Sequence, residues 1–167
     1  MEHQEYNAIQ EKINLGVGAA EVGEKQYLTF LMAGEEYGVD ILSVQEIRGW
    51  DKTTAIPNAP EFVNGVMNLR GAIVPVIDLR LRFNLEQIEY GPVTVVIVVK
   101  VELEEGEKII GLVVDAVSDV YTVNELEARQ APEVGENENR EFVKGLINIE
   151  EKLVVLLDLK PVLTYQF

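Results

Sequence analysis

The hydrophobic residues of this chain are grouped in short runs rich in valine, isoleucine and leucine, and polar or glycine-containing turns separate the runs. The runs YLTFLM and VTVVIVVKV, for example, are followed by the polar turns AGEE and ELEEGEK. Short β-branched runs at this spacing are typical of antiparallel strands. Several runs are almost continuously apolar, so we expect other parts of the molecule to cover these strands on both faces. The pattern therefore predicts an all-β fold without long helices.

Most of this pattern occurs twice. The sequence FVNGVMNLRGAIVPVIDLRLRF at residues 62–83 returns as FVKGLINIEEKLVVLLDLKPVL at residues 142–163. The segment YGVDILSVQEI at residues 37–47 returns in the same way as IGLVVDAVSDV at residues 110–120. Two sets of about five strands predict two small barrels or sandwiches that arose by duplication and pack against each other.

The polar stretch NLEQIEYGP at residues 84–92 interrupts the apolar pattern and contains a Gly-Pro pair, which is typical of a boundary. We therefore predict a first β-barrel subdomain at residues 25–90 and a second one at residues 91–167. Residues 1–24 show weak patterning, so we predict that they form a mobile tail.

The residues that both copies share are expected to serve the fold, because the fold is what the copies have in common. These pairs are Gly65 and Gly145, Asn68 and Asn148, and Asp78 and Asp158. The tip of the central hairpin differs: Arg70-Gly71 in the first copy is replaced by Glu150-Glu151 in the second. Glycine adopts a positive φ more easily than glutamate does, so we expect the two turns to differ in geometry.

The strand before this hairpin also differs between the copies, VQEIRG against VSDVYT. If the strand and the hairpin are neighbours, Glu46 and Arg70 can form an ion pair that fixes the guanidinium group, with Val44 and Ile47 beside it. The alternative is an ordinary surface pair, worth only about 0 to 1 kcal/mol. The residues alone leave both interpretations open.

Asp78 and Asp158 each end one copy of the hairpin and allow two interpretations. A duplicated β-protein can share a proton between two carboxylates, as aspartic proteases do. That chemistry needs a Thr-Gly or Ser-Gly after the aspartate, however, and leucine follows both aspartates here. The favoured interpretation is that each aspartate caps a short helix, and Pro161 in the first turn of the second helix agrees with it.

Composition narrows the classes of function. The chain has no cysteine and a single histidine, His3, which argues against thiolate metal sites, multi-histidine zinc sites and serine-histidine triads. A net charge of -15 disfavours binding to nucleic acid. The N-terminus lacks a secretory pattern, and the longest uncharged apolar run, at residues 93–99, is too short to cross a bilayer. We therefore expect a cytoplasmic protein without direct membrane insertion.

Three segments together resemble a known family. EEYGVDILSVQEIRG, IPNAPEFVNGVMNLRGAIVPVIDLR and GLVVDAVSDV are similar to the CheW family of bacterial chemotaxis adaptors, and the resemblance covers roughly residues 25–163. It implies two five-stranded barrels of the Src homology 3-like type on a shared core, with short helices. It also implies a non-catalytic adaptor without cofactors, which couples the cytoplasmic tips of methyl-accepting chemotaxis receptors to the regulatory domain of the histidine kinase CheA.

The resemblance also assigns residues to surfaces. It implies receptor binding by the first barrel and by the seam, meaning the junction between the two barrels. The residues are Val44, Glu46, Ile47, Arg70, Gly65 and Val120. It implies kinase binding by the second barrel, near Gly145 and Leu146. Two alternatives stay open. One is the adaptor half of a CheV-type protein, which is disfavoured because it would need an additional receiver domain with a phospho-accepting aspartate cluster. The other is a small barrel that binds a ligand on Trp50, the only tryptophan. Packing is the favoured role of Trp50.

Overall fold

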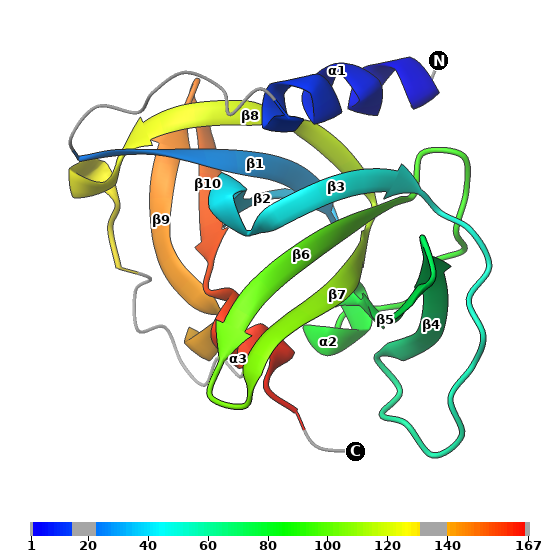
Figure 1. The fold of residues 1–167 in the computed structure, drawn as a ribbon. Helices are drawn as coiled ribbons and strands as arrows, with labels where there is room; N and C mark the ends of the chain where they lie inside the picture. Colours follow the sequence, from blue (N-terminus) through cyan, green and yellow to red (C-terminus); the bar gives the residue numbers. More distant parts are fainter. Residues whose placement is uncertain (1, 15–22, 131–139, 166–167) are drawn as a thin grey trace.

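Two five-stranded β-sheets make up most of the molecule (Figure 1), as the hydrophobic pattern predicts. The structure, a computed structural model, describes residues 2–14, 23–130 and 140–165. The strands of the first sheet, in spatial order, are β8 (Ala116–Asn124), β1 (Glu24–Met32), β2 (Glu35–Asp40), β10 (Lys152–Leu157) and β9 (Val143–Ile149). Those of the second are β3 (Val44–Gly49), β6 (Val95–Leu103), β7 (Gly106–Val114), β5 (Ala72–Asp78) and β4 (Val63–Leu69).

The two copies of the repeat exchange strands between the sheets. By the sequence repeat, β1 to β5 of the first copy correspond to β6 to β10 of the second. The first sheet combines β1 and β2 with β8, β9 and β10, and the second combines β6 and β7 with β3, β4 and β5. The prediction that residues 25–90 and 91–167 form separate barrels is therefore wrong for the pairing of the strands: each sheet takes two strands from one copy and three from the other.

Each sheet is joined across the copies by one parallel pair, β2 with β10 and β7 with β5. A shared glycine lies at each junction. A Cβ atom on Gly111 would lie 2.8 Å from Cγ1 of Val96, and one on Gly38 would lie 3.2 Å from Cδ2 of Leu156. The glycines at these two places of the repeat thus leave room for side chains of the adjacent strands.

The two sheets share one hydrophobic core, as expected. Its fully buried members include Leu28 and Phe30 on β1 and Ile97 on β6, which come from different sheets and different copies. Burial of such side chains is the main stabilising contribution in a fold of this size. The almost continuously apolar runs are explained by this arrangement, because β6 has buried residues on both of its faces.

One short helix follows the last strand of each copy, and an aspartate caps each helix. Asp78 precedes α2 (Leu79–Arg82) and accepts a hydrogen bond from the backbone N–H of Leu81, at 3.3 Å. Asp158 precedes α3 (Leu159–Leu163) and accepts one from the N–H of Lys160, at 3.2 Å. The capping prediction is confirmed for both aspartates. In the described part of the chain, short 3-10 helices also lie between strands: η1 (Ile41–Ser43), η2 (Glu125–Glu127) and η3 (Arg140–Phe142).

The expected boundary at residues 84–92 is tied to the second sheet by Tyr90. Its hydroxyl group donates a hydrogen bond to the buried carboxylate of Asp78 and accepts one from Nδ2 of Asn64, at 2.9 Å. Burial and the carboxylate of Asp78 both raise the pKa of Tyr90. The ring of Trp50 lies 4.3 Å from the ring of Tyr90, so Trp50 takes part in packing, as favoured above.

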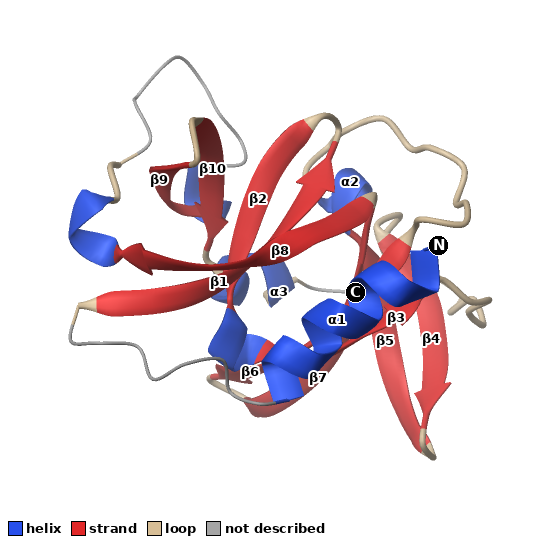
Figure 2. Ribbon diagram, turned by 90° about the horizontal axis from the view of Figure 1, so that it is seen from above, coloured by secondary structure: helices blue, strands red, loops and turns tan. Residues whose placement is uncertain are grey.

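Residues 2–14 form a helix, α1 (Glu2–Asn14), which packs against β3 and β8 (Figures 1 and 2). The prediction of a mobile tail is therefore wrong for this part of residues 1–24, whereas residues 1 and 15–22 lie outside the described residues. Among the described side chains of α1, the apolar ones that contact the sheets are Ile9 and Ile13, which give only a weak sequence pattern. Among the described residues, no helix has the length and the apolar character needed to cross a membrane.

Candidate functional site

The candidate site is built on the turn between β4 and β5. Leu69 pairs with Ala72, so Arg70 and Gly71 form a two-residue hairpin turn, and their φ angles are 52° and 88°. Positive φ at both central residues is the type I′ geometry, which matches the twist of the two strands. The turn therefore holds Arg70 at the very tip of the hairpin.

The matching turn of the second copy has the same geometry. Ile149 pairs with Lys152, and Glu150 and Glu151 have φ angles of 49° and 68°. The prediction that the two turns differ is therefore wrong, because a two-residue connection between twisted strands imposes this conformation on whichever residues occupy it. A left-handed conformation costs a non-glycine residue about 1 to 2 kcal/mol. Glu150 and Glu151 are therefore strained at this turn.

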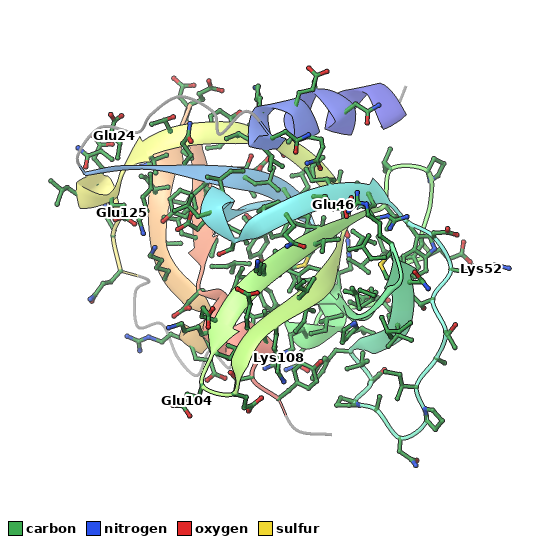
Figure 3. All side chains as sticks on the ribbon, in the orientation of Figure 1. Glu24, Glu46, Lys52, Glu104, Lys108 and Glu125 are labelled. Carbon is green, nitrogen blue, oxygen red and sulfur yellow. The ribbon has the colours of Figure 1, made fainter. Side chains whose placement is uncertain are left out.

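Arg70 and Glu46 form the predicted ion pair, and it is bidentate. Nη1 and Nη2 of Arg70 lie 3.1 and 3.2 Å from the two carboxylate oxygens of Glu46. The pair joins the turn beside β4 to strand β3, the two strands at opposite ends of the sheet order, so this sheet curls back on itself. Figure 3 shows Glu46 where β3 approaches the β4–β5 hairpin.

This pair contributes little to stability but fixes a charged group. The side chain of Arg70 is 78% exposed, and that of Glu46 is 17% exposed. An ion pair with so much solvent around one partner is worth about 0 to 1 kcal/mol. Because two parallel hydrogen bonds orient the planar guanidinium group, Arg70 is preorganised for a partner while most of its surface stays accessible.

Val44 and Ile47 do not lie on the surface, contrary to the assignment above. Both side chains are buried in the shared core. A β-bulge between Val44 and Glu46 shifts the pairing of β3 by one residue, so both apolar side chains face inward while Glu46 faces out. In this arrangement both side chains lie beneath the site, in one cluster with Ile9 of α1.

Gly65 also has a structural role, in closing the second sheet. Backbone hydrogen bonds of 2.8 Å join Thr54, which follows β3, to Val66 on β4. Gly65 has a φ of 151°, and a Cβ atom there would lie 2.4 Å from the carbonyl oxygen of Thr54. Its counterpart Gly145 lies beside the equivalent bridge, in which Arg129 pairs with Leu146. The structural interpretation is therefore supported for both glycines.

The second copy presents only acids where the first has its ion pair. Asp119 on β8 is the counterpart of Glu46, and Glu150 is the counterpart of Arg70. Burial first, and then the charges of Glu150 and Asp119, raise the pKa of the neighbouring Tyr121. Instead of pairing with the hairpin turn, Asp119 forms an ion pair of 2.7 Å with Lys12 of α1. Guanidinium presentation is thus a property of the first copy.

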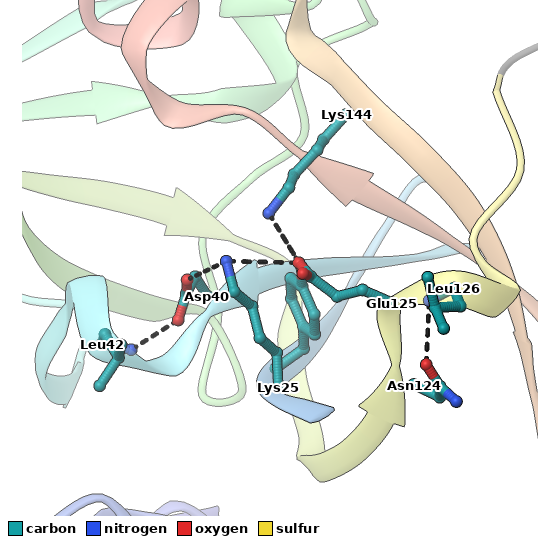
Figure 4. Close-up of polar contacts among 8 residues, drawn as sticks. Lys25, Asp40, Leu42, Asn124, Glu125, Leu126 and Lys144 are labelled. Carbon is teal, nitrogen blue, oxygen red and sulfur yellow. Dashed lines mark hydrogen bonds and ion pairs between the residues drawn. The ribbon is translucent and has the colours of Figure 1, made fainter. Parts of the chain in front are cut away.

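The residues expected to contact the kinase lie at the other end of the molecule, on β9. Leu146 is half-buried and lines a hollow with Arg129, and the exposed Leu126 and Leu153 lie on the rim of this hollow. Their side chains are 87% and 54% exposed. Figure 4 shows the neighbouring polar network, in which Glu125 accepts from Lys144 and lies 3.3 Å from Lys25. The hollow is therefore lined by both apolar and polar side chains and lies beside a fixed set of charges.

Sequence reasoning missed the residues of α1 beside the candidate site. Gln10 and Asn14 line a polar hollow together with Glu46 and Arg70. Val120 on β8, expected near the seam, is half-buried and packs against the same core cluster as α1 does. The signal that could have found α1 is the pair of isoleucines at positions 9 and 13, one helical turn apart.

Comparison with known proteins places the chain in a family. The CheW-like domain family matches residues 26–167. The chemotaxis protein CheW of Klebsiella aerogenes is 44% identical over 146 residues, which cover 87% of this chain and 86% of that protein. CheW of Bacillus subtilis is 35% identical over 141 residues, which cover 84% and 87% of the two chains.

A solved structure agrees with these matches. The crystal structure of the scaffolding protein TtCheW from Thermoanaerobacter tengcongensis aligns with a TM-score of 0.73 at 34% identity, and the alignment covers 83% of this chain and 91% of that one. Family match, sequence identity and fold therefore agree over the same region, and this chain belongs to the CheW family of chemotaxis scaffold proteins.

Proposed function

We propose that this protein is a non-catalytic adaptor that couples the cytoplasmic tips of methyl-accepting chemotaxis receptors to the regulatory domain of the histidine kinase CheA. The observation that carries the receptor side of the proposal is the Glu46–Arg70 pair, a bidentate fork held on a hairpin tip with the arginine 78% exposed. Arginine is one of the residue types enriched among those that dominate binding at protein interfaces. The receptor tip is a helical hairpin in this family, and Arg70 would bind acidic or carbonyl groups along it.

The kinase side of the proposal uses the hollow beside Leu146. Leu126 and Leu153 line this hollow together with Leu146 and are exposed to solvent, so they offer neighbouring apolar side chains to a partner. Strands β9 and β10 and the β4–β5 hairpin lie at opposite ends of the molecule (Figures 1 and 2). Both partners can therefore bind at once, which a coupling protein at the cytoplasmic face of the membrane requires.

A charge swap distinguishes the effect of the Arg70 charge on receptor binding from its effect on the stability of the fold. Arg70→Glu should abolish binding of a purified receptor-tip fragment, because the cation is lost and Glu46 adds a like charge. Glu46→Arg combined with Arg70→Glu restores an ion pair across the same gap but reverses its polarity. If the receptor binds the positive charge at the hairpin tip, this double variant should fold normally and still fail to bind the receptor fragment.

The matched control is Glu150→Arg, which alters the charge at the equivalent turn of the second copy. It should leave receptor binding unchanged. Each variant should bind a regulatory fragment of CheA as the unmodified protein does and should melt within a few degrees of it, because an exposed pair is worth about 0 to 1 kcal/mol. Full receptor binding by Arg70→Glu would contradict the role of Arg70, and an unmodified protein that binds neither fragment would contradict the adaptor function itself.

A further inference from the structure

Helix α1 lies across the two strands that border the candidate receptor site. It packs against β3 of the second sheet and β8 of the first (Figures 1 and 2). These two strands correspond to each other in the repeat, and each is the outermost strand of its sheet. No other helix of the described residues touches both of these strands closely enough to bridge them. The helix therefore occupies the seam between the sheets.

The contacts of α1 are those of an amphipathic helix in a groove. Ile9, 5% exposed, is buried in the same core cluster as Val44 and Ile47, and Ile13, four residues later, packs against that cluster from the same face. Val120 on β8 borders the cluster as well. Apolar residues at positions i and i+4 are the usual means by which a helix binds a hydrophobic groove.

Polar contacts fix the helix at both strands. Oε1 of Gln10 accepts a hydrogen bond of 2.6 Å from the backbone N–H of Ile47, on the open edge of β3. Nζ of Lys12 lies 2.7 Å from Oδ1 of Asp119 on β8. The edge of β3, which would otherwise offer free backbone groups to another chain, is thus partly satisfied by a side chain of α1.

The last turn of α1 reaches the charged pair. Gln10 and Asn14 line one polar hollow with Gln45, Glu46 and Arg70. Any helix that lay along the seam and also contacted Arg70 would have to use space that α1 fills. The occupied groove and the proposed receptor contact are therefore one continuous surface.

We infer that α1 is a built-in competitor, which covers the seam between β3 and β8 and is displaced when a partner helix binds there. The inference rests on the proposed function, because the partner is the helical tip of a receptor. The displacing helix would present two aliphatic side chains one turn apart to the cluster at Val44, Ile47 and Val120. The described side chains of α1 hold it by two isoleucines, one amide and one exposed ion pair. A helix held in this way belongs to the less stable parts of a structure, which open before the rest unfolds.

The test compares Ile9→Asp with Ala8→Asp in the full chain. Both variants add the same charge to α1, but Ile9 is buried against the sheets while Ala8 is exposed. Ile9→Asp should release the helix and tighten binding of a purified receptor-tip fragment about 10-fold, because the fraction of molecules with an open seam rises. Ala8→Asp should bind like the unmodified protein, and the affinity for the CheA regulatory fragment should not change in either variant.

Hydrogen exchange at the Ile47 amide reports on the position of α1 directly. This amide should exchange faster in Ile9→Asp, and also in the unmodified protein when the receptor fragment is added, if the incoming helix removes the Gln10 acceptor without replacing it. Lys12→Glu is a second test, which does not depend on whether Ile9→Asp folds, since it changes only the exposed ion pair with Asp119. It should tighten receptor binding by about 3-fold.

The outcomes separate the two proposals. If the unmodified protein binds the receptor fragment and neither Ile9→Asp nor Lys12→Glu binds it more tightly, α1 is a structural helix and the competition is refuted, while the adaptor function stands. If no variant binds the fragment, the adaptor function and the competition fall together. Should Ile9→Asp not fold, the comparison of Lys12→Glu with the unmodified protein decides.

Discussion

The glycines at positions 65 and 145 offer a matched pair of substitutions within one molecule. They occupy equivalent places in the repeat, each beside an isolated bridge, but their surroundings differ. A Cβ atom on Gly65 would lie 2.4 Å from a backbone carbonyl oxygen, well inside the 3.0 Å below which real Cβ atoms essentially never come. On Gly145 the closest approach is 3.1 Å, to the carbonyl oxygen of Arg129.

The loss of stability caused by Gly65→Ala follows from the hydrogen bonds that it would disrupt. The backbone at Thr54 has to move, which breaks or weakens the two hydrogen bonds of 2.8 Å to Val66. Each is worth about 1 kcal/mol, and alanine at a φ of 151° adds about 1 to 3 kcal/mol of strain. We therefore expect a loss of about 3 to 5 kcal/mol in the free energy of unfolding.

Gly145→Ala should cost about 1 kcal/mol or less, because a few tenths of an ångström of movement relieve the contact and alanine restricts the unfolded chain. Urea unfolding followed by the fluorescence of Trp50 and by circular dichroism measures both variants. With a slope of about 2 kcal/mol per molar urea, the midpoint of Gly65→Ala should lie at least about 1 M lower than that of Gly145→Ala. Equal midpoints, or the reverse order, would refute this account of the bridge.

Three further predictions concern charge, turn strain and strand exchange. The carboxylate of Asp115 receives two hydrogen bonds from Arg80, of 2.8 and 2.6 Å. Burial alone would raise the pKa of Asp115, but these hydrogen bonds, the backbone bond from the β1–β2 turn and the charge of Arg80 lower it below 3.8. A lowered native pKa stabilises the fold above the unfolded value, so the unmodified protein should lose stability relative to Asp115→Asn as the pH falls below about 4, measured by urea titrations at several pH values. Glu151→Gly should raise the unfolding free energy by about 0.5 to 1 kcal/mol, because it removes left-handed strain at the second turn; an unchanged melting temperature would contradict this. Fragments 1–90 and 91–167 should each stay unfolded by circular dichroism and regain strand structure only when mixed, since each sheet needs strands from both; a folded single fragment would contradict the exchange.

The internal repeat made the local features of this fold predictable. The helix caps at Asp78 and Asp158 and the pair of Glu46 with Arg70 follow from residues that are shared or changed between the copies. Sequence could not assign strands to sheets, because β5 and β10 have nearly the same apolar pattern and either could pair with β2. Long-range pairing of equivalent strands is decided by the whole core, and no local pattern reports it.

The orientation of side chains on β3 was unpredictable for a different reason. Simple alternation along SVQEI would place Val44 and Glu46 on one face, and the bulge separates them. A bulge shifts the register by one residue without a distinctive sequence signal. Helix α1 was overlooked because its apolar pattern is weak; among its described side chains, Ile9 and Ile13 are those that contact the core.

The exchange of strands also sets an order of events during synthesis. When residues 1–90 have left the ribosome, β3 still lacks β6 and β7, which separate it from β5, and the β1–β2 hairpin lacks both of its neighbours. The second sheet can be completed once β7 has emerged, but the first must wait for β9 and β10, the last of the described strands to be made. The β1–β2 hairpin, the earliest of the described hairpins to be made, is thus enclosed only when the last described strands emerge, and its uncovered edges are exposed to aggregation until then.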